Sequence, residues 1–253
     1  MRQFILLAVL LAACASPPSP LTQQTVVHTY LRETFPDTVF LCDYAVSSAA
    51  ALGGGTIYVL PQALSFIRCD FRGPVLAGRH ERDRLQGGTL NFAESTLAGG
   101  LDMHLASLTN DLCLYEAQVR GPLRLDGIRV GAMLDLRRAT CSEDTRLSSV
   151  SVASFSADRA HFEAGLTLQR ALVTETLSMV ETEVDGYLDA TYLTVYGGAY
   201  MEHVKSRDRA NFDYAEVRGR WRLAGASFAK ASLRYVRAAR GLEGAAEGVE
   251  LGL

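Results

Sequence analysis

The chain lacks any apolar run long enough to cross a membrane as a helix and any long run of like charge. The apolar stretch Phe4 to Leu11 falls well short of the ~20 residues that a spanning helix needs. A net charge of -3 over 253 residues leaves no basic footprint, so we expect no nucleic-acid partner. With 48% hydrophobic and 21% charged residues, the composition is that of a folded protein.

Motifs for cofactors and metals are also lacking. No GxGxxG or GxxxxGK[ST] follows a predicted strand, so a nucleotide cofactor is not expected. No cysteine pair has CxxC spacing, and the histidines have no metal-ligand spacing. These histidines are interpreted as surface residues: His28, His80, His104, His161 and His203. We therefore expect no cofactor and no metal.

The N-terminus has the order of a secretory signal: basic Arg2, an apolar run, and small residues before Cys14. Leu11-Ala12-Ala13-Cys14 resembles the lipobox of bacterial lipoproteins, which implies cleavage after residue 13 and acylation of Cys14. An ordinary signal peptide with a chance cysteine is the alternative. Ala15 and Ser16, where Asp would signal retention, resemble the enterobacterial signal for the outer membrane, facing the periplasm or the cell surface. The Pro/Ser-rich residues 14–20 are interpreted as a tether.

Four further cysteines would enter an oxidising compartment after export. Cys42 and Cys69 are candidates for a disulfide around the glycine run 53–55. Cys113 and Cys141 fall on opposite-facing positions of the repeat described next, so we expect no bond between them.

An 11-residue repeat runs from Leu90 to Phe228 in about thirteen units, with one step shortened by a residue. Positions 1, 3, 6 and 8 are apolar, as in Leu112, Leu114, Ala117 and Val119. The residues that break this rule are Ser95, Thr145, Thr182 and Ser206. This spacing predicts two short strands in each unit, because strand side chains alternate with a period of two.

An 11-residue period also fits a right-handed helical coiled coil. The many glycines and β-branched residues oppose helices, since Gly destabilises a helix by up to about 1 kcal/mol. Position 10 is often glycine, as in Gly99, Gly121, Gly186, Gly197 and Gly219, which favours a corner where φ can be positive. The prediction is an all-β solenoid whose coils stack because no unit can bury its apolar face alone.

Two units would close a four-sided coil of about 22 residues. Cys69-Asp70-Phe71-Arg72-Gly73 and Ala210-Asn211-Phe212-Asp213-Tyr214 resemble the A-(D/N)-(L/F)-x-x unit of pentapeptide-repeat proteins. That resemblance implies a right-handed, four-sided β-helix. This chain departs from the family because it alternates steps of five and six residues, and Leu often replaces the small residue.

We expect five segments: a signal peptide at 1–13, a tether at 14–20, an N-terminal cap region at 21–56, the solenoid at 57–239 and a C-terminal cap or disordered tail at 240–253. A capping helix is expected over Thr22 to Phe35, since its apolar residues share one helical face and Pro36 follows. The polar run Arg79 to Gln86 is expected to project as a loop.

The predicted binding patch lies in the C-terminal half, where position 5 brings Tyr192 over Tyr214. The remaining candidates are Asp189, Tyr196, Tyr200, His203 and Asp213. Exposed aromatic residues flanked by carboxylates suit a protein or glycan partner, although a tyrosine ladder can also stabilise neighbouring strands.

These observations favour a non-enzymatic envelope lipoprotein that is held to the membrane by its N-terminal lipid and offers a rigid surface to an envelope protein or a glycan. A polysaccharide lyase or hydrolase is the enzymatic alternative, but the units carry no long inserted loops to build a cleft, and no catalytic residues are identified. DNA mimicry, which the pentapeptide-repeat resemblance implies, is opposed by export.

The lipobox gives a direct prediction. Replacing Cys14→Ser removes the thiol that would carry the lipid, so metabolic labelling with palmitate should fail and the protein should leave the membrane fraction. Retention of the acyl label by the variant would contradict the lipoprotein interpretation.

Overall fold

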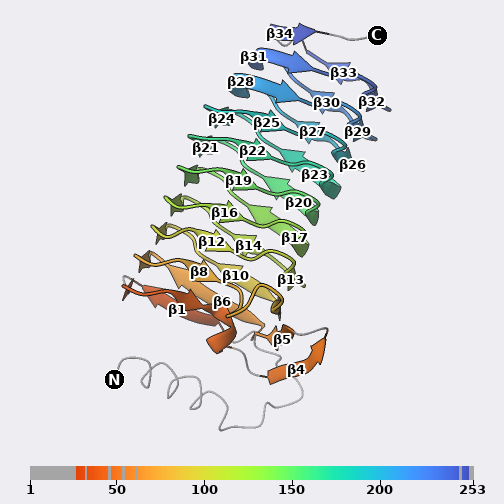
Figure 1. The fold of residues 1–253 in the computed structure, drawn as a ribbon. Coiled ribbons are helices and arrows are strands. Elements are labelled where there is room, and N and C mark those ends of the chain that lie inside the picture. The colour runs from red at the N-terminus through yellow and green to blue at the C-terminus, as the bar shows by residue number, and fades with distance from the viewer. Residues whose placement is uncertain are drawn as a thin grey trace.

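The computed structural model describes residues 27–31, 33–44, 47–52, 55–60, 62–244 and 247–250. The predicted signal peptide (1–13), the predicted tether (14–20) and Cys14 lie outside the described residues. The described chain is an all-β solenoid of about eight turns, drawn as a stack of coils in Figure 1. It forms two sheets of 17 strands, here called sheet A and sheet B.

Sheet A consists of β1 (Val27–Leu31), β4 (Ser47–Leu52), β5 (Gly55–Val59), β6 (Ala63–Ile67), β9 (Arg84–Gly87), β10 (Thr89–Asn91), β13 (Ser107–Leu108), β14 (Leu112–Cys113), β17 (Arg129–Asp135), β20 (Ser151–Ser156), β23 (Leu172–Ser178), β26 (Thr194–Val195), β27 (Ala199–Tyr200), β29 (Glu216–Val217), β30 (Trp221–Arg222), β32 (Arg237–Ala238) and β33 (Leu242–Glu243).

Sheet B consists of β2 (Thr34–Phe35), β3 (Val39–Phe40), β7 (Asp70–Phe71), β8 (Val75–Leu76), β11 (Thr96–Leu97), β12 (Leu101–Asp102), β15 (Gln118–Val119), β16 (Leu123–Arg124), β18 (Thr140–Cys141), β19 (Thr145–Arg146), β21 (His161–Phe162), β22 (Leu166–Thr167), β24 (Glu183–Val184), β25 (Leu188–Asp189), β28 (Lys205–Asn211), β31 (Ser227–Ser232) and β34 (Glu247–Glu250). The helical element among the described residues is the short 3-10 turn η1 (Leu41–Tyr44), and no described helix could cross a membrane.

Each regular coil has four short strands, as in β10, β11, β12 and β13, which confirms the four-sided coil. Strands pair in parallel with those one coil away, so Leu90 lies beside Leu112 and Leu112 beside Leu134, a step of 22 residues. The chain crosses from sheet A to sheet B once per coil and returns once per coil. These two crossings are diagonally opposite corners.

The predicted inward set is confirmed. Every residue at positions 1, 3, 6 and 8 from Leu90 to Phe228 is buried, with at most 4% of its surface exposed. Three of the four polar exceptions donate their hydroxyls to the main chain: Ser95 to the carbonyl of Phe66 (2.6 Å), Thr182 to that of Ala157 (2.7 Å) and Ser206 to that of Gly186 (3.4 Å). These buried hydroxyls have acceptors, whereas Oγ1 of Thr145 has no hydrogen-bond partner among the described residues.

Positive φ occurs at position 5, not at the position-10 glycines as predicted. Thirteen described non-glycine residues, Glu116 among them, have φ of 54° to 61°. The turn is held by hydrogen bonds: the Glu116 N–H donates to Arg137 O one coil on, and the Ala117 N–H donates to Leu114 O. These bonds compensate for a left-handed conformation that costs about 1–2 kcal/mol per residue.

Where position 10 is glycine, the backbones of neighbouring coils approach each other too closely for a side chain. A Cβ on Gly197 would lie 1.6 Å from the carbonyl oxygen of Glu175, and one on Gly219 would lie 2.3 Å from that of Gly197. The backbone there has no room for a side chain, whatever its φ.

Within the described part of the segment 22–35, the predicted N-terminal capping helix is not formed. Residues 27–31 and 34–35 are the strands β1 and β2, which pair in parallel with β6 and β7 and therefore form the first coil. The solenoid thus begins before residue 57, and the antiparallel hairpin β4–β5 is added at this end of sheet A. At the other end β33 and β34 pair with β30 and β31, so the described part of the predicted tail continues the stack.

The polar run 79–86 does not project as a simple loop. Asp83 is buried, and its carboxylate accepts hydrogen bonds from the backbone N–H groups of Thr56 (3.0 Å), Arg79 (2.9 Å) and His80 (3.0 Å). Arg84 then begins β9. This polar run therefore forms a tight turn around the inward-pointing carboxylate of Asp83.

None of the four described cysteines, Cys42, Cys69, Cys113 and Cys141, forms a disulfide in this structure, so the expected Cys42–Cys69 bond is not made. Cys69 lies just before β7, whereas Cys42 pairs its N–H with Ala77 beyond β8, at the other end of that side of the coil. Cys113 and Cys141 face opposite ways, as predicted. Burial raises the pKa of Cys42 and Cys69 to about 11 and that of Cys141 to about 12, so these thiols stay protonated.

Trp221 allows the core to be tested. Its side chain is fully buried against Phe212, and its Nε1 has no acceptor among the described residues. Trp221→Ala should lower the free energy of unfolding by about 3–5 kcal/mol. Trp221→Phe should lower it by less, because the cavity is smaller and the unpaired N–H is removed.

Urea unfolding measures both values. The exposed Lys230→Ala is the control, expected within about 0.5 kcal/mol of wild type. A Trp221→Ala protein as stable as this control would contradict the predicted core.

Candidate functional site

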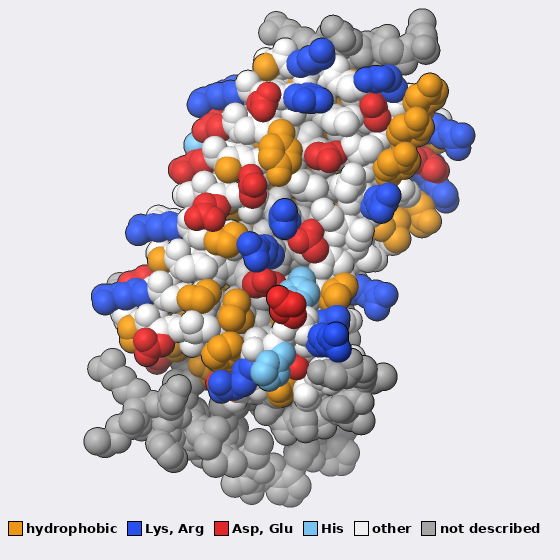
Figure 2. All heavy atoms as spheres, in the orientation of Figure 1, with side chains coloured by type: hydrophobic (Ala, Val, Ile, Leu, Met, Phe, Trp, Pro, Cys, Tyr) orange, Lys and Arg blue, Asp and Glu red, His pale blue; other side chains and the backbone are white. Residues whose placement is uncertain are grey.

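Position 5 at the crossing from sheet B to sheet A forms a column that we call the aromatic corner. Its C-terminal part holds Tyr192, Tyr214 and Tyr235 in consecutive coils. Tyr192 and Tyr214 stack with ring centroids 4.8 Å apart and planes 9° apart, as predicted, and Tyr214 and Tyr235 stack at 4.9 Å and 17°. In Figure 2 hydrophobic side chains form a column along one edge of the C-terminal half.

Stacking leaves few ring faces free at the aromatic corner. Both faces of Tyr214 are covered by its neighbours, and the Arg170 guanidinium lies 6.0 Å from the ring centroid of Tyr192. The tyrosines are nevertheless between 46% and 69% exposed, so they present ring edges and hydroxyls to solvent. Such a surface suits contact with a protein better than stacking on a flat ligand.

The other predicted patch residues do not join this column. Tyr196 and Tyr200 lie on the side formed by sheet A, and arginines of the next coil cover their rings: Arg218 at 4.1 Å and Arg222 at 5.5 Å. His203 lies at the opposite corner, where its imidazole rests over Gly225. The seven predicted residues therefore do not form one patch.

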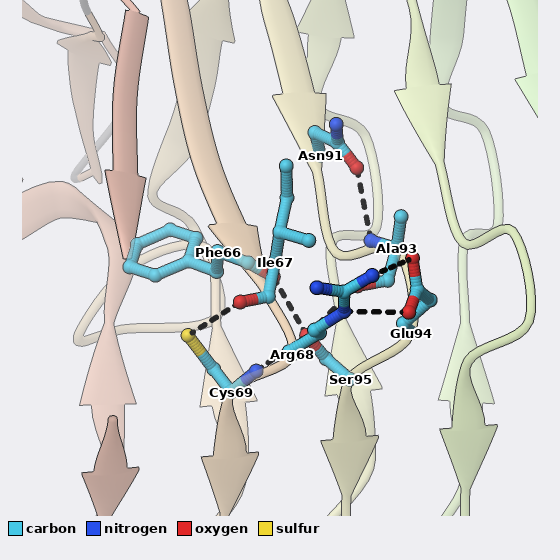
Figure 3. A network of polar contacts seen from close by, with 8 residues as sticks. All are labelled: Phe66, Ile67, Arg68, Cys69, Asn91, Ala93, Glu94 and Ser95. Carbon is cyan, nitrogen blue, oxygen red and sulfur yellow. Dashed lines mark hydrogen bonds and ion pairs between the residues drawn. The ribbon is translucent and has the colours of Figure 1, made fainter. Parts of the chain in front are cut away.

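The opposite corner, here called the charged corner, carries position 5 of the alternate units. Arg68 pairs with Glu94 at 2.7 Å, Arg138 with Glu116 at 2.8 Å, and Arg159 with Glu181 at 2.7 Å. Figure 3 shows the first pair together with the hydrogen bonds of Ser95 and Asn91 that hold the turn. Exposed pairs of this kind contribute at most about 1 kcal/mol each.

Asp189 and Asp213 complete the turns. The Oδ1 atom of Asp189 accepts the N–H and hydroxyl of Thr191, and Oδ1 of Asp213 accepts the N–H of Arg234 (2.8 Å) and the hydroxyl of Ser232 (2.6 Å). Position-4 N–H groups in other coils are bonded in the same way, as Arg137 N–H to Oδ1 of Asp135 (3.0 Å), which satisfies a backbone donor at the turn. The sequence signal for these acids is thus largely structural.

A shallow, open hollow of about 320 Å³ was not predicted from the sequence. It is lined by Tyr187, Leu188, Asp189, Asp208, Arg209 and Asn211. These residues flank and form the adjacent strands β25 and β28 of sheet B. Of the residues predicted for the patch, only Asp189 belongs to it.

Two histidine–carboxylate pairs lie among the described residues, and their hydrogen-bonding groups are used within the solenoid. His104 contacts Asp102 through Nδ1 (2.7 Å) and the carbonyl of Glu81 through Nε2 (3.0 Å), so both ring nitrogens are used. His161 contacts Asp185 at 3.0 Å, and Asp185 also pairs with Arg207. No group of histidine, cysteine and acidic residues within the described ranges could hold a metal ion.

His104 makes stability depend on pH. Burial lowers the pKa of His104, but hydrogen bonds to Asp102 and to the carbonyl of Glu81 outweigh burial, so this pKa lies above the ordinary histidine value of 6.5. Only the imidazolium can donate to both acceptors at once. Its stabilisation should be complete below pH 6.5 and lost as pH rises through the higher folded pKa.

The difference in unfolding free energy between wild type and His104→Ala measures this effect in urea. We expect a larger difference at pH 5.5 than at pH 9. An equal difference at both pH values would show that the His104 charge is not linked to folding.

Known proteins give no guide to the site. No family model, no curated protein and no solved structure matches this chain.

Proposed function

We propose that the chain is a lipid-anchored protein of the bacterial cell envelope, with a structural or interaction role, which presents its rigid solenoid surface to a protein or glycan partner. The observation that carries the proposal is the exposed tyrosine stack of the aromatic corner, held at one register by continuous backbone pairing. A surface fixed in this way loses little conformational entropy on binding. Anchoring through Cys14 and placement in the outer membrane rest on the N-terminal sequence.

The side chains support binding over catalysis. Asp102, Asp189 and Asp213 each use an oxygen on turn N–H groups, and His104 uses both ring nitrogens. With both ring nitrogens engaged, His104 has no free lone pair with which to act as a general base. At the charged corner, hydrogen bonds from Arg138 and Arg159 lower the pKa of Glu116 and of Glu181, so these two carboxylates stay ionised and paired.

A polysaccharide-active enzyme is the second candidate, because the hollow at β25 and β28 contains two carboxylates, Asp189 and Asp208. Glycoside hydrolysis needs such a pair across the scissile bond. Turnover of a polysaccharide by wild type but not by Asp208→Asn would establish this candidate, and its absence over a broad panel would remove it.

The interaction role is tested by capture from solubilised envelopes. We expect the Tyr192→Ala, Tyr214→Ala double variant to lose a partner that wild type retains, because the exposed ring edges are removed. The control is Glu116→Ala with Arg138→Ala, which deletes one coil-to-coil contact at the opposite corner and should retain the partner.

Both variants must first show wild-type circular dichroism. Equal capture by both double variants, or no partner for wild type, would count against an interaction role for the aromatic corner.

A further inference from the structure

The hollow at β25 and β28 arises where the repeat changes length. Between β28 and the preceding coil, Val184 of β24 pairs with Ser206 and Leu188 of β25 pairs with Ala210, both 22 residues apart. Between β28 and β31 of the following coil, Ser206 pairs with Phe228, 22 residues on, but Arg209 pairs with Lys230, only 21 residues on. β28 therefore carries one more residue at this corner than β31, and Asp208 and Arg209 of this irregular corner line the hollow.

Tyr187 supplies an aromatic face beside this irregular corner. Its ring rests on Gly165 of the preceding coil, where a Cβ would lie 2.3 Å from Cε1, and its hydroxyl lies 3.4 Å from Oγ1 of Thr167. The side chain is 39% exposed. Within the described residues, no aromatic ring or guanidinium stacks on it, in contrast to Tyr192, Tyr196, Tyr200 and Tyr214.

Polar groups surround this face. Asp189 keeps Oδ2 available after its turn bonds, Asn211 offers an amide, and Asp208 and Arg209 are exposed without an ion pair among the described residues. Together they can accept from and donate to several hydroxyl groups. Two carboxylates against one guanidinium make the hollow net negative, which disfavours an anionic ligand.

We propose that this hollow is a binding subsite for a neutral pyranose unit of a glycan. The flat C–H face of the sugar packs on Tyr187, and its hydroxyls bond to Asp189, Asp208, Arg209 and Asn211. A volume of about 320 Å³ is at the small end of ligand sites and suits a short glycan segment. The inference rests on the proposed binding function and names its ligand class.

The test uses cellohexaose and chitohexaose as neutral probes and hexagalacturonate as the anionic one. Saturation-transfer NMR and calorimetry on the full chain should show weak binding of a neutral probe and none of the anionic one. Tyr187→Ala should weaken binding about tenfold or more, since it removes the stacking face. Tyr187→Phe should bind within about threefold of wild type, because the face is kept.

Tyr235→Ala is the matched control, since it removes a more exposed tyrosine at the aromatic corner and should leave sugar affinity unchanged. Binding of neither neutral probe, preference for hexagalacturonate, or equal affinity of Tyr187→Ala and wild type would overturn the subsite. Envelope capture by the aromatic corner distinguishes the two proposals. If that capture succeeds while the sugars fail, the interaction role stands and the subsite falls.

Discussion

Parallel hydrogen bonding between successive coils is the constraint on which the rest of this structure depends. Each inward strand lies beside its counterpart one coil away, and the position-5 turns are tied to the next coil in the same way, as Tyr192 N–H to Asp213 O. One such bond contributes only about 0.5–1.5 kcal/mol, but the pattern repeats through the stack. Because it fixes a register of about 22 residues, it also decides which side chains meet.

That register makes equivalent positions into columns, and the two crossing corners use it differently. The charged corner places opposite charges at equivalent positions of successive coils, as Glu116 and Arg138. These ion pairs are exposed, so salt weakens them. The aromatic corner places Tyr214 between two like rings, and this stacking does not depend on ionic strength. The same left-handed backbone supports both, because its strain is met by main-chain bonds and not by the side chain.

The repeat could be predicted because burial imposes a period. The spacing of apolar residues in the sequence predicts that Leu112 and Leu114 point inward, as they do. The 22-residue spacing likewise predicts the stack of Tyr192 on Tyr214. Tyr235 also occupies position 5, but it lies beyond the predicted repeat, which ends at Phe228. The unit that begins at Trp221 is one residue shorter than the others, so Tyr235 falls out of the 11-residue spacing.

Features formed by irregular steps could not be predicted in this way. Residues 27–31 carry the spacing of an amphipathic helix, and only pairing with β6 makes them a strand. In the sequence Asp83 is one charge in a polar run, which predicts a solvent-exposed side chain. In the structure its carboxylate accepts hydrogen bonds from three backbone N–H groups. The hollow at Tyr187 is built from two successive coils, Tyr187 and Asp189 of one and Asp208 and Arg209 of the next, and its shape is not contained in the local pattern of either.

The number of stacked coils sets the length of the solenoid. β1 and β34 lie at opposite ends of it (Figure 1). Neighbouring coils are separated by about 4.8 Å, the ordinary spacing between strands. From β6 to β27 there are six such steps, through β10, β14, β17, β20 and β23, or roughly 29 Å. If the lipid on Cys14 anchors the first coil, the number of coils sets how far from the membrane the tyrosine-bearing half stands, and gain or loss of one 22-residue coil would change that reach without altering the surface itself.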